Sequence, residues 1–368
     1  MTIILLILAV VLITLEIRSV KVPPDKLDYE VKVSSNTVEQ GEEFTITSVY
    51  TNRTGQKLPF ICSEEYISPH IEIEGLKNKK AEIYSGYDED AIDHKKTYSI
   101  YMKKNERITH SEKAKCYKRG IFLLSSCVLT IGDYLGLKTK ISRRTTNCWV
   151  AVRPRRLQDA RLDSLFKGIL GDISVKSFIF EDPMLVRGFR DYSGSEPFRS
   201  ISFAQSAKAG NLIVKEFDHT RETTVDIIFD ADFKGCIDGF FDRIETCFAL
   251  TRTLTENLAN RKINFRFITN LCYSSYTDAD ITVIEGDYHK LLEFLTGASR
   301  ATSCKYREFI DYLETHLTSA DASIVYITQD SNEETEIALH ELQSKYNINT
   351  HVLSGRDFEE IYHDSKIL

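Results

Sequence analysis

The sequence has none of the short motifs that mark the common enzyme classes. It contains no Gly-x-Ser-x-Gly elbow, no Walker loop, no His-Glu-x-x-His pair of zinc ligands and no Gly-x-Gly-x-x-Gly after an apolar run. Its nine histidines are scattered singly, and an isolated histidine is more often a surface or hydrogen-bonded residue than a catalyst. We therefore expect no catalytic residues and predict that the chain is not an enzyme.

Paired cysteines and an excess of basic charge are also missing. The eight cysteines are widely spaced without a Cys-x-x-Cys, so neither a zinc site nor a redox pair is suggested, and buried reduced thiols are expected. An even number of cysteines would still permit disulfides in an exported protein. A net charge of −7 gives no overall attraction to nucleic acid, so no nucleic-acid partner is expected.

The N-terminus is a long stretch without charge. Residues 2–15 are mostly Ile, Leu and Val, and as a helix they would span about 21 Å of the roughly 30 Å hydrocarbon core. Residues 1–20 are therefore predicted to be a transmembrane anchor that contacts lipid and crosses the cell membrane once. A cleaved signal peptide is the alternative, although the segment has neither a basic start nor a small-x-small cleavage site. Because Arg18, Lys21 and Lys26 follow the segment and no basic residue precedes it, the positive-inside rule predicts a cytoplasmic body.

Two periodicities divide the remaining chain and predict a multidomain protein. From residue 28 to 152, short runs alternate apolar and polar residues between turn-forming residues, which predicts an antiparallel β-sandwich. From residue 223 to 368, apolar runs such as Val225–Phe229 alternate with helical patterns, which predicts a mainly parallel α/β sheet with helices on both faces. Residues 153–222 show no strong period and are interpreted as a connector. Trp149, the only tryptophan, is expected to anchor the sandwich core.

The connector contains the most distinctive pattern of the chain, a charged turn followed by an apolar strand. Its characteristic residues are Arg190, Tyr192, Gly194, Arg199, Lys215 and Glu216. This pattern resembles the signature of the family catalogued as domain of unknown function 58. The resemblance implies a β-sandwich ahead of the signature and a von Willebrand factor A-like, Rossmann-like domain after it. Members of that family commonly carry two N-terminal membrane helices, whereas this sequence has one.

The end of the first apolar strand of the α/β domain is a candidate metal site. Ligands of such sheets bind at the carboxyl ends of the strands, and Asp230 ends this strand. The resembled domain carries an Asp-x-Ser-x-Ser magnesium motif there, whereas this chain has Asp230, Asp232 and Lys234 at the three positions. Lys234 places a cation where the motif has a hydroxyl, so it repels a metal and can pair with the aspartates instead. We therefore interpret Asp230 and Asp232 as a degenerate site and expect no cofactor, with Mg²⁺ as the ion that an intact site would take. Candidates for further ligands are Asp330, Thr302 and Thr296.

The charged residues of the signature have two interpretations. Acidic residues, among them Glu196 and Glu216, are interleaved with basic ones. Paired carboxylates can carry out acid–base catalysis, so a hydrolase is a weak alternative. The preferred interpretation is an ion-paired network in which Arg190, Tyr192 and Arg199 set the angle between the two domains.

These observations together predict a membrane-anchored, non-enzymatic adaptor that binds other proteins. Members of the resembled family are often linked with MoxR-type AAA+ ATPases. The resemblance thus implies such an ATPase as the partner and a substrate-recruiting role for this chain. The alternative is an exported, metal-dependent adhesion or ligand-binding module. That alternative would need the opposite membrane topology, with the body outside the cytoplasm, and a metal bound at Asp230 and Asp232.

Overall fold

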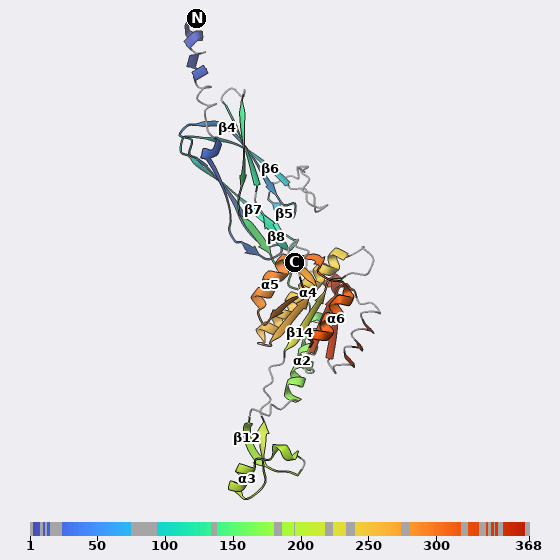
Figure 1. Cartoon of the computed structure of the whole chain (residues 1–368). Coiled ribbons are helices and arrows are strands. Elements are labelled where there is room, and N and C mark those ends of the chain that lie inside the picture. Colours follow the sequence, from blue (N-terminus) through green and yellow to red (C-terminus); the bar gives the residue numbers. More distant parts are fainter. Residues whose placement is uncertain are drawn as a thin grey trace. The chain divides into compact units, whose positions relative to one another are not determined.

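The structure is a computed structural model of the 368-residue chain (Figure 1). It divides into two compact units, Met1–Arg155 and Arg156–Leu368, and each is described by itself. The residues that the structure describes are 3–7, 10–11, 13–14, 24–74, 94–124, 126–133, 138–179, 186–194, 196–217, 224–232, 240–273, 280–317, 323–330, 336–337, 340–341, 343–344 and 349–364.

The first unit contains two antiparallel four-stranded sheets. Its strands are β1 (Leu27–Val33), β2 (Thr37–Val38), β3 (Glu43–Asn52), β4 (Leu58–Ile67), β5 (Ile71–Ile73), β6 (His94–Met102), β7 (Arg107–Cys116), β8 (Gly120–Leu123), β9 (Ser126–Gly132), β10 (Thr139–Thr145) and β11 (Trp149–Val152). One sheet has the order β1-β3-β7-β5 and the other β10-β9-β4-β6. A small third sheet joins β2, β11 and β8, and β2 runs parallel to β11.

The alternation of apolar and polar residues explains how the two larger sheets pack. In β3, Phe44 and Ile46 are buried while the residue between them is only half-buried, because successive side chains of a strand point to opposite faces. One hydrophobic cluster combines Leu27 and Tyr50 from the first sheet with Ile61 from the second. The antiparallel β-sandwich predicted from this alternation is therefore confirmed.

A buried ionic network crosses between the two sheets. Lys96 on β6 forms ion pairs with Glu112 on β7 and, at 3.8 Å, with Glu65 on β4. The Tyr50 hydroxyl donates to Glu65 Oε1 at 2.6 Å, and the Tyr98 hydroxyl donates to Glu112 Oε1 at 2.6 Å. The side chains of Lys96 and Glu65 are only 4% and 3% exposed. Buried charges are tolerated when they are paired and hydrogen-bonded, and this network meets both conditions.

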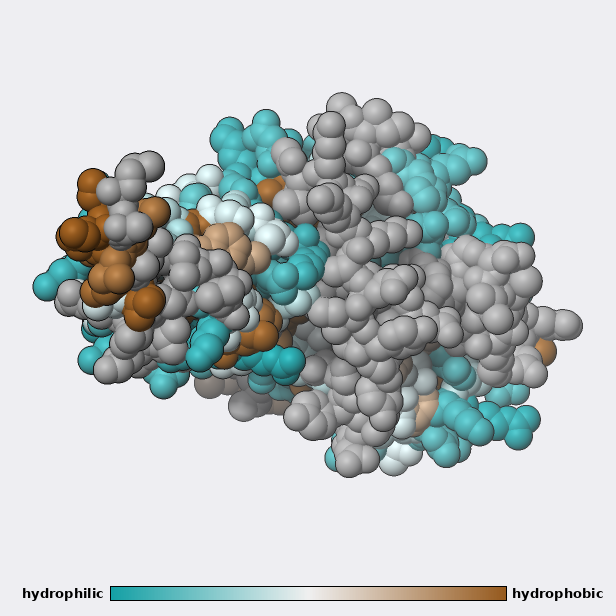
Figure 2. Space-filling model, turned by 90° about the horizontal axis from the view of Figure 1, so that it is seen from above, coloured by the Kyte–Doolittle hydropathy of each residue, from teal (hydrophilic) through white to brown (hydrophobic). Residues whose placement is uncertain are grey.

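The N-terminal segment is helical where the structure describes it. The large apolar residues of this helical part are exposed, among them Ile3, Leu6 and Val10. Figure 2, seen from above, shows a group of strongly hydrophobic residues at the surface. Within the described ranges, no helix has the length and apolar character needed to span a bilayer. Residues 15–20 of the predicted anchor lie outside those ranges, so the anchor stays a prediction.

The second unit is built around a five-stranded mixed sheet. Its strands are β14 (Val225–Asp230), β15 (Phe265–Thr269), β17 (Thr282–Glu285), β19 (Ser323–Thr328) and β20 (Asn349–Ser354). Their order is β17-β15-β14-β19-β20, in which β17 is antiparallel and the other four are parallel. The other elements beside it, several of them visible in Figure 1, are α2 (Ala160–Ile179), α4 (Phe240–Asn260), α5 (Tyr288–Gly297), α6 (Tyr306–His316), η3 (Gly355–Phe358), α8 (Glu359–Asp364) and the short pair β16 (Leu271–Tyr273) and β18 (Ala298–Thr302).

Both faces of this sheet are covered. All six residues of β14 are buried, as expected for the central strand of a sheet covered on both faces, and they include Asp226, which pairs with Arg266 at 2.7 Å. Ile227 and Phe229 belong to one cluster, which includes Phe248 of α4. Ile228 belongs to a second cluster, with Phe309 of α6. The predicted mainly parallel α/β sheet is therefore confirmed, while its von Willebrand factor A-like character stays a prediction.

The segment interpreted as a connector contains a long packed helix. In α2, Leu162, Phe166, Ile169 and Leu170 are buried in the main hydrophobic cluster of the second unit. Their spacing is that of one face of an amphipathic helix, which is hard to recognise in the sequence among the charged residues. The Leu157 N–H also donates to a hydroxyl of α4 at 3.0 Å. The chain therefore joins the second core soon after it leaves the first.

Trp149 is not the core anchor that the sequence suggested. Its side chain is 39% exposed, whereas Val150 and Val152 on the same strand are fully buried. Alternation along β11 places the valines in the core and turns the tryptophan outward. The prediction was wrong because the position of a side chain along the strand, and not its size, decides which face of the sheet it occupies.

The cysteines of the described part of the chain are free thiols. Burial raises the pKa of Cys116 to about 11 and that of Cys127 to about 12. A thiol reacts as the thiolate, so these two residues are protonated and unreactive at neutral pH.

Candidate functional site

Asp230 lies at the carboxyl end of β14, where three donors hold its carboxylate. Asn270 Nδ2 donates to Asp230 Oδ1 at 2.8 Å, and the Asp232 N–H donates to the same oxygen at 3.0 Å. The Tyr326 hydroxyl donates to Oδ2 at 2.7 Å. Asp230 is 2% exposed, so these bonds replace its contacts with water. Asn270 follows β15 and Tyr326 lies in β19, so the carboxylate links three adjacent strands.

The protonation of this group follows from its burial. Burial raises the pKa of the Asp230 carboxyl, and the bonds from Tyr326, Asp232 and Asn270 oppose the rise. Burial and then the neighbouring Asp230 raise the pKa of Tyr326, which therefore stays a donor at neutral pH. A magnesium ion would have to compete with existing donors, because Oδ1 already accepts two bonds and Oδ2 one. The geometry thus favours a structural role for Asp230.

Asp232 serves as a cap for the helix α6. Its Oδ2 accepts a bond from the N–H of Tyr306, the first residue of α6, at 2.9 Å. A carboxylate there satisfies an otherwise unpaired N–H and interacts favourably with the helix dipole. The structure therefore brings Asp230 and Asp232 together, as predicted, but pairs both with groups of the protein. Lys234 lies outside the described residues, so its repulsion of a metal stays a prediction.

The other candidate metal ligands have separate roles. Asp330 Oδ2 pairs with Arg243 at 3.5 Å and with Arg356 at 3.3 Å. The Thr296 hydroxyl donates to a carbonyl of its own helix, α5, at 2.7 Å. Thr302 lies on β18, where it pairs with Leu271 of β16. The structure thus gives these three residues partners other than Asp230 and does not support their grouping into one metal site.

The signature residues lie together in one small substructure, which we call the hairpin body and define as residues 186–217. It consists of β12 (Val186–Asp191), η2 (Phe198–Ser200), α3 (Phe203–Ala209) and β13 (Ile213–Phe217), and β12 pairs with β13 in antiparallel fashion. The signature residues in order are Arg190 on β12, Tyr192 and Gly194 in the following turn, Arg199 in η2, and Lys215 and Glu216 on β13. Gly194 has a φ of +96°, a left-handed conformation that favours glycine. The pattern thus corresponds to one folded element, and its role in setting a domain angle stays a prediction.

Glu196 is held inside the hairpin body by neighbouring donors. The Ser193 hydroxyl donates to its Oε1 at 2.7 Å, the Ser193 N–H donates to Oε2 at 3.0 Å, and Arg190 Nη1 donates to Oε1. Bonds from Ser193 and Arg190 lower the pKa of Glu196 to about 2. An acid–base catalyst needs a pKa near the working pH, so Glu196 is unsuited to that task. The arrangement supports the ion-paired interpretation over the hydrolase.

The hairpin body also presents aromatic side chains to solvent. Phe198 and Phe203 are 74% and 60% exposed, with ring centroids 5.6 Å apart. Ile201 and Val214 are buried and form a bridge between η2 and β13, so the body has a small interior of its own. The exposed phenylalanines are therefore additional to the residues that hold the body together. The sequence pattern alone does not single them out.

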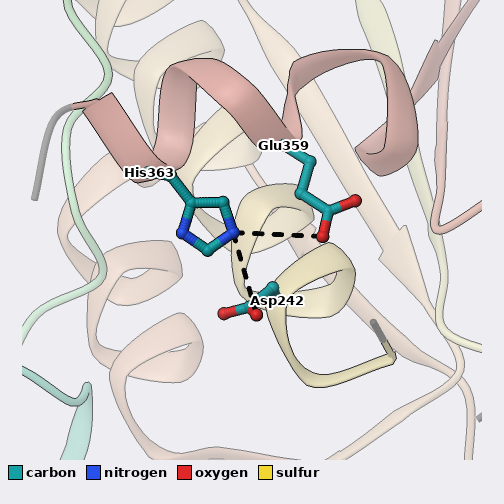
Figure 3. A group of neighbouring side chains, drawn as sticks. All are labelled: Asp242, Glu359 and His363. Carbon is teal, nitrogen blue, oxygen red and sulfur yellow. Dashed lines mark ion pairs between the residues drawn. The ribbon is translucent and has the colours of Figure 1, made fainter. Parts of the chain in front are cut away.

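A further cluster, which the sequence does not predict, joins two helices (Figure 3). Asp242 lies in the first turn of α4, and Glu359 and His363 lie one turn apart on α8. His363 Nε2 is 3.8 Å from Asp242 Oδ2 and 3.9 Å from Glu359 Oε1. The Glu-x-x-x-His spacing is a sequence signal, because it places both side chains on one helix face. Nothing in the sequence indicates that Asp242 would join them.

Comparison with known proteins gives no family assignment. No family model matches the chain, and no curated protein matches it. Among solved structures, the chain is similar to a CARDB domain from Pyrococcus furiosus crystallised with di-metal ions, at a TM-score of 0.21 and 10% identity over 35% of this chain and 90% of that one. It is also similar to a fragment of native alpha-2-macroglobulin from Escherichia coli, at a TM-score of 0.25 and 12% identity over 35% of this chain and 24% of that one. Similarities at this level carry no argument, so the fold described above rests on strand pairing and packing.

Proposed function

We propose that this chain is a non-enzymatic adaptor that holds a partner protein beside a membrane, with the partner-binding surface on the hairpin body. The observation that carries the proposal is the exposed pair Phe198 and Phe203. Leaving a large apolar side chain in water forgoes about 1.5–3 kcal/mol of burial free energy. Aromatic residues are enriched at protein interfaces, where a partner recovers that free energy.

Other side chains of the hairpin body suit the same role. Phe189 and Leu212 are also exposed, and so are the basic residues Arg199 and Lys208. Aromatic residues and arginines dominate the binding free energy of many protein interfaces. The partner that fits this composition has an apolar pocket with an acidic rim.

The identity of the partner follows from the family resemblance. The signature in the hairpin body resembles that of domain of unknown function 58, and the mixed sheet covered on both faces is compatible with a von Willebrand factor A-like domain. We therefore assign a MoxR-type AAA+ ATPase as the partner, with this chain recruiting substrates to it.

Membrane attachment is supported by the N-terminal segment. Its exposed apolar residues, such as Ile3, Leu6 and Val10, would leave water on entering lipid, at about 25 cal/mol for each Å² of apolar surface. The basic residues Arg18 and Lys21 follow this segment, which agrees with a cytoplasmic position of the body.

The double variant Phe198→Ala/Phe203→Ala is expected to bind the ATPase at least about tenfold more weakly than the unchanged chain. Aromatic anchors at an interface contribute about 1–2 kcal/mol or more each, and 1.4 kcal/mol corresponds to tenfold. The measurement is the affinity of the purified chain for a purified MoxR-type ATPase, by biolayer interferometry, with and without ATP.

The matched control for this experiment is Ile141→Ala. Ile141 is 67% exposed on β10 of the first unit, so the change removes apolar surface that is not part of the hairpin body. It should leave the affinity unchanged. If the double variant binds as tightly as the control, the surface assignment is wrong, and if the unchanged chain does not bind in either nucleotide state, the partner is wrong.

Deletion of residues 1–20 is expected to move the protein from the membrane pellet to the supernatant after cell lysis. The apolar surface that holds it in lipid is then missing. Immunoblots of the two fractions measure the change. Trypsin added to intact cells should leave the body of the full chain uncut, and cleavage there would contradict the cytoplasmic orientation.

A further inference from the structure

The cluster Asp242–Glu359–His363 has the composition of a metal site. Its three ligand atoms, one imidazole nitrogen and two carboxylate oxygens, all lie within 4.8 Å of one another. They come from two helices that each follow a parallel strand, α4 after β14 and α8 after β20 through η3. Both helices therefore begin at the carboxyl edge of the sheet, where α/β proteins usually bind ligands. The side chains converge on a common point in Figure 3.

The carboxylate of Glu359 also has an arginine as a charged neighbour. Arg243 Nε lies 3.6 Å from Glu359 Oε2, and the same guanidinium reaches Asp330 at 3.5 Å through Nη1. Because Oε2 faces this arginine, Oε1 is the oxygen turned toward His363, at 3.9 Å. Metal-binding carboxylates are commonly oriented by a second hydrogen-bonding or charged partner in this way.

The two helices are also held at a fixed separation. A Cβ atom added at Gly355 would lie 2.6 Å from the backbone oxygen of Arg243 and 2.8 Å from Cys247 Sγ. The backbone of η3 therefore packs directly on α4, which is possible because residue 355 has no side chain. Since α8 continues from η3, this contact sets the distance between Asp242 and the two ligands on α8.

We propose that Asp242, Glu359 and His363 bind a divalent transition-metal ion, with Zn²⁺ as the ion that best suits one nitrogen and two oxygen ligands, and that the ion fastens α8 to α4. Calcium and magnesium prefer sites made only of oxygen, whereas zinc accepts histidine with carboxylates. Zinc bonds of about 2.0–2.2 Å in a tetrahedron place the ligand atoms about 3.3–3.6 Å apart. The 3.8 and 3.9 Å separations from His363 Nε2 are close to that range, and the two carboxylate oxygens, which lie within 4.8 Å of each other, approach it through rotation of partly exposed side chains. Three protein ligands leave the fourth position of the tetrahedron to water.

The test is zinc binding to the full chain, freed of metal by a chelator and carrying no histidine tag. Isothermal titration with ZnCl₂ should give one site, and His363→Ala or Glu359→Gln should weaken it at least about tenfold. With zinc at 100 times its Kd, the melting temperature of the unchanged chain should rise by about 5–10 °C. The Co²⁺-loaded chain should show the visible absorption of a four-coordinate site, and His363→Ala should lose it.

Two control variants distinguish zinc bound at this cluster from zinc bound elsewhere on the chain. His316→Ala removes an exposed histidine of α6 that stacks on Tyr312, and Asp230→Asn alters the carboxylate at the end of β14. Both should bind zinc as the unchanged chain does. The proposal is overturned if the unchanged chain shows no stoichiometric zinc binding, which would leave the cluster as ion pairs only, or if His363→Ala binds zinc equally well.

Discussion

Replacing Lys96 with methionine is expected to lower the free energy of unfolding of the first unit by about 3–5 kcal/mol. Lys96 is the cation between Glu65 and Glu112, and it bridges the two sheets of the sandwich. Methionine fills a similar volume but leaves the buried carboxylate of Glu65 without its cation. An uncompensated buried charge is among the most destabilising changes that a single substitution can make.

The single tryptophan makes this prediction measurable in the intact chain. Trp149 lies on β11 of the first unit, so its fluorescence during urea unfolding reports on that unit. The control is Lys113→Met, which removes a lysine from an exposed pair with Glu43 and should lower the stability far less than Lys96→Met does. Equal losses in the two variants would show that the network contributes no more than a surface ion pair.

Replacing Asp230 with alanine is expected to lower the stability of the second unit by about 3 kcal/mol, whereas Asp230→Asn should cost about 1 kcal/mol or less. Alanine leaves the amide of Asn270 and the hydroxyl of Tyr326 buried without their acceptor, at about 1–3 kcal/mol for each unsatisfied group. Asparagine keeps an oxygen for Asn270, and its amide N–H can donate to the oxygen of Tyr326, so only the hydroxyl proton of Tyr326 loses its acceptor, while no charged carboxylate has to be buried. Hydrogen exchange of the β14 and β19 amides measures the stability of the second unit in both variants.

The pH dependence of stability, compared between Asp230→Asn and the unchanged chain, gives an independent check on the burial of Asp230. The pKa of Asp230 is raised in the folded state, so between its ordinary value near 4 and the raised value the folded state binds more protons than the unfolded state. The contribution of Asp230 to stability therefore falls as the pH rises through that window. Asparagine does not titrate, so the stability of Asp230→Asn relative to the unchanged chain should increase between pH 4 and pH 7. A difference that is constant with pH would contradict the burial of an ionisable carboxyl at this position. Addition of Mg²⁺ should change the stability of neither the unchanged chain nor Asp230→Asn.

The sequence predicts those parts of the fold in which local pattern and burial agree. The run Val225–Phe229 has the composition of a strand buried on both faces, and it is the central strand of the sheet. The sequence does not predict the strand β4, because one of its core positions is occupied by Glu65, which looks like a surface residue in the sequence. Its partners Lys96 on β6 and Tyr50 on β3 make burial of that position possible, and these pairings cannot be derived from local pattern.

The candidate sites, too, can be predicted only as far as local sequence pattern determines them. The position of Asp230 follows from the rule that ligands bind at the carboxyl ends of parallel strands. Its partners Asn270 and Tyr326 depend on which strands lie beside β14 and in what register, and these are properties of the whole sheet. The cluster of Asp242, Glu359 and His363 is not predicted from the sequence, because it depends on the packing of two helices far apart in the sequence; only the Glu-x-x-x-His spacing is a local signal.

The strand order of the sheet also determines when the second unit can fold during synthesis. The central strand β14 needs β19 on one side, and Val225 pairs with Ser323, so about a hundred residues must be translated before that edge of β14 is covered. At about 5–20 residues per second, the ribosome needs about 5–20 s for this stretch. During this interval the six residues of β14 remain available to other chains. We therefore expect that slowing translation between β14 and β19 increases aggregation of the nascent second unit.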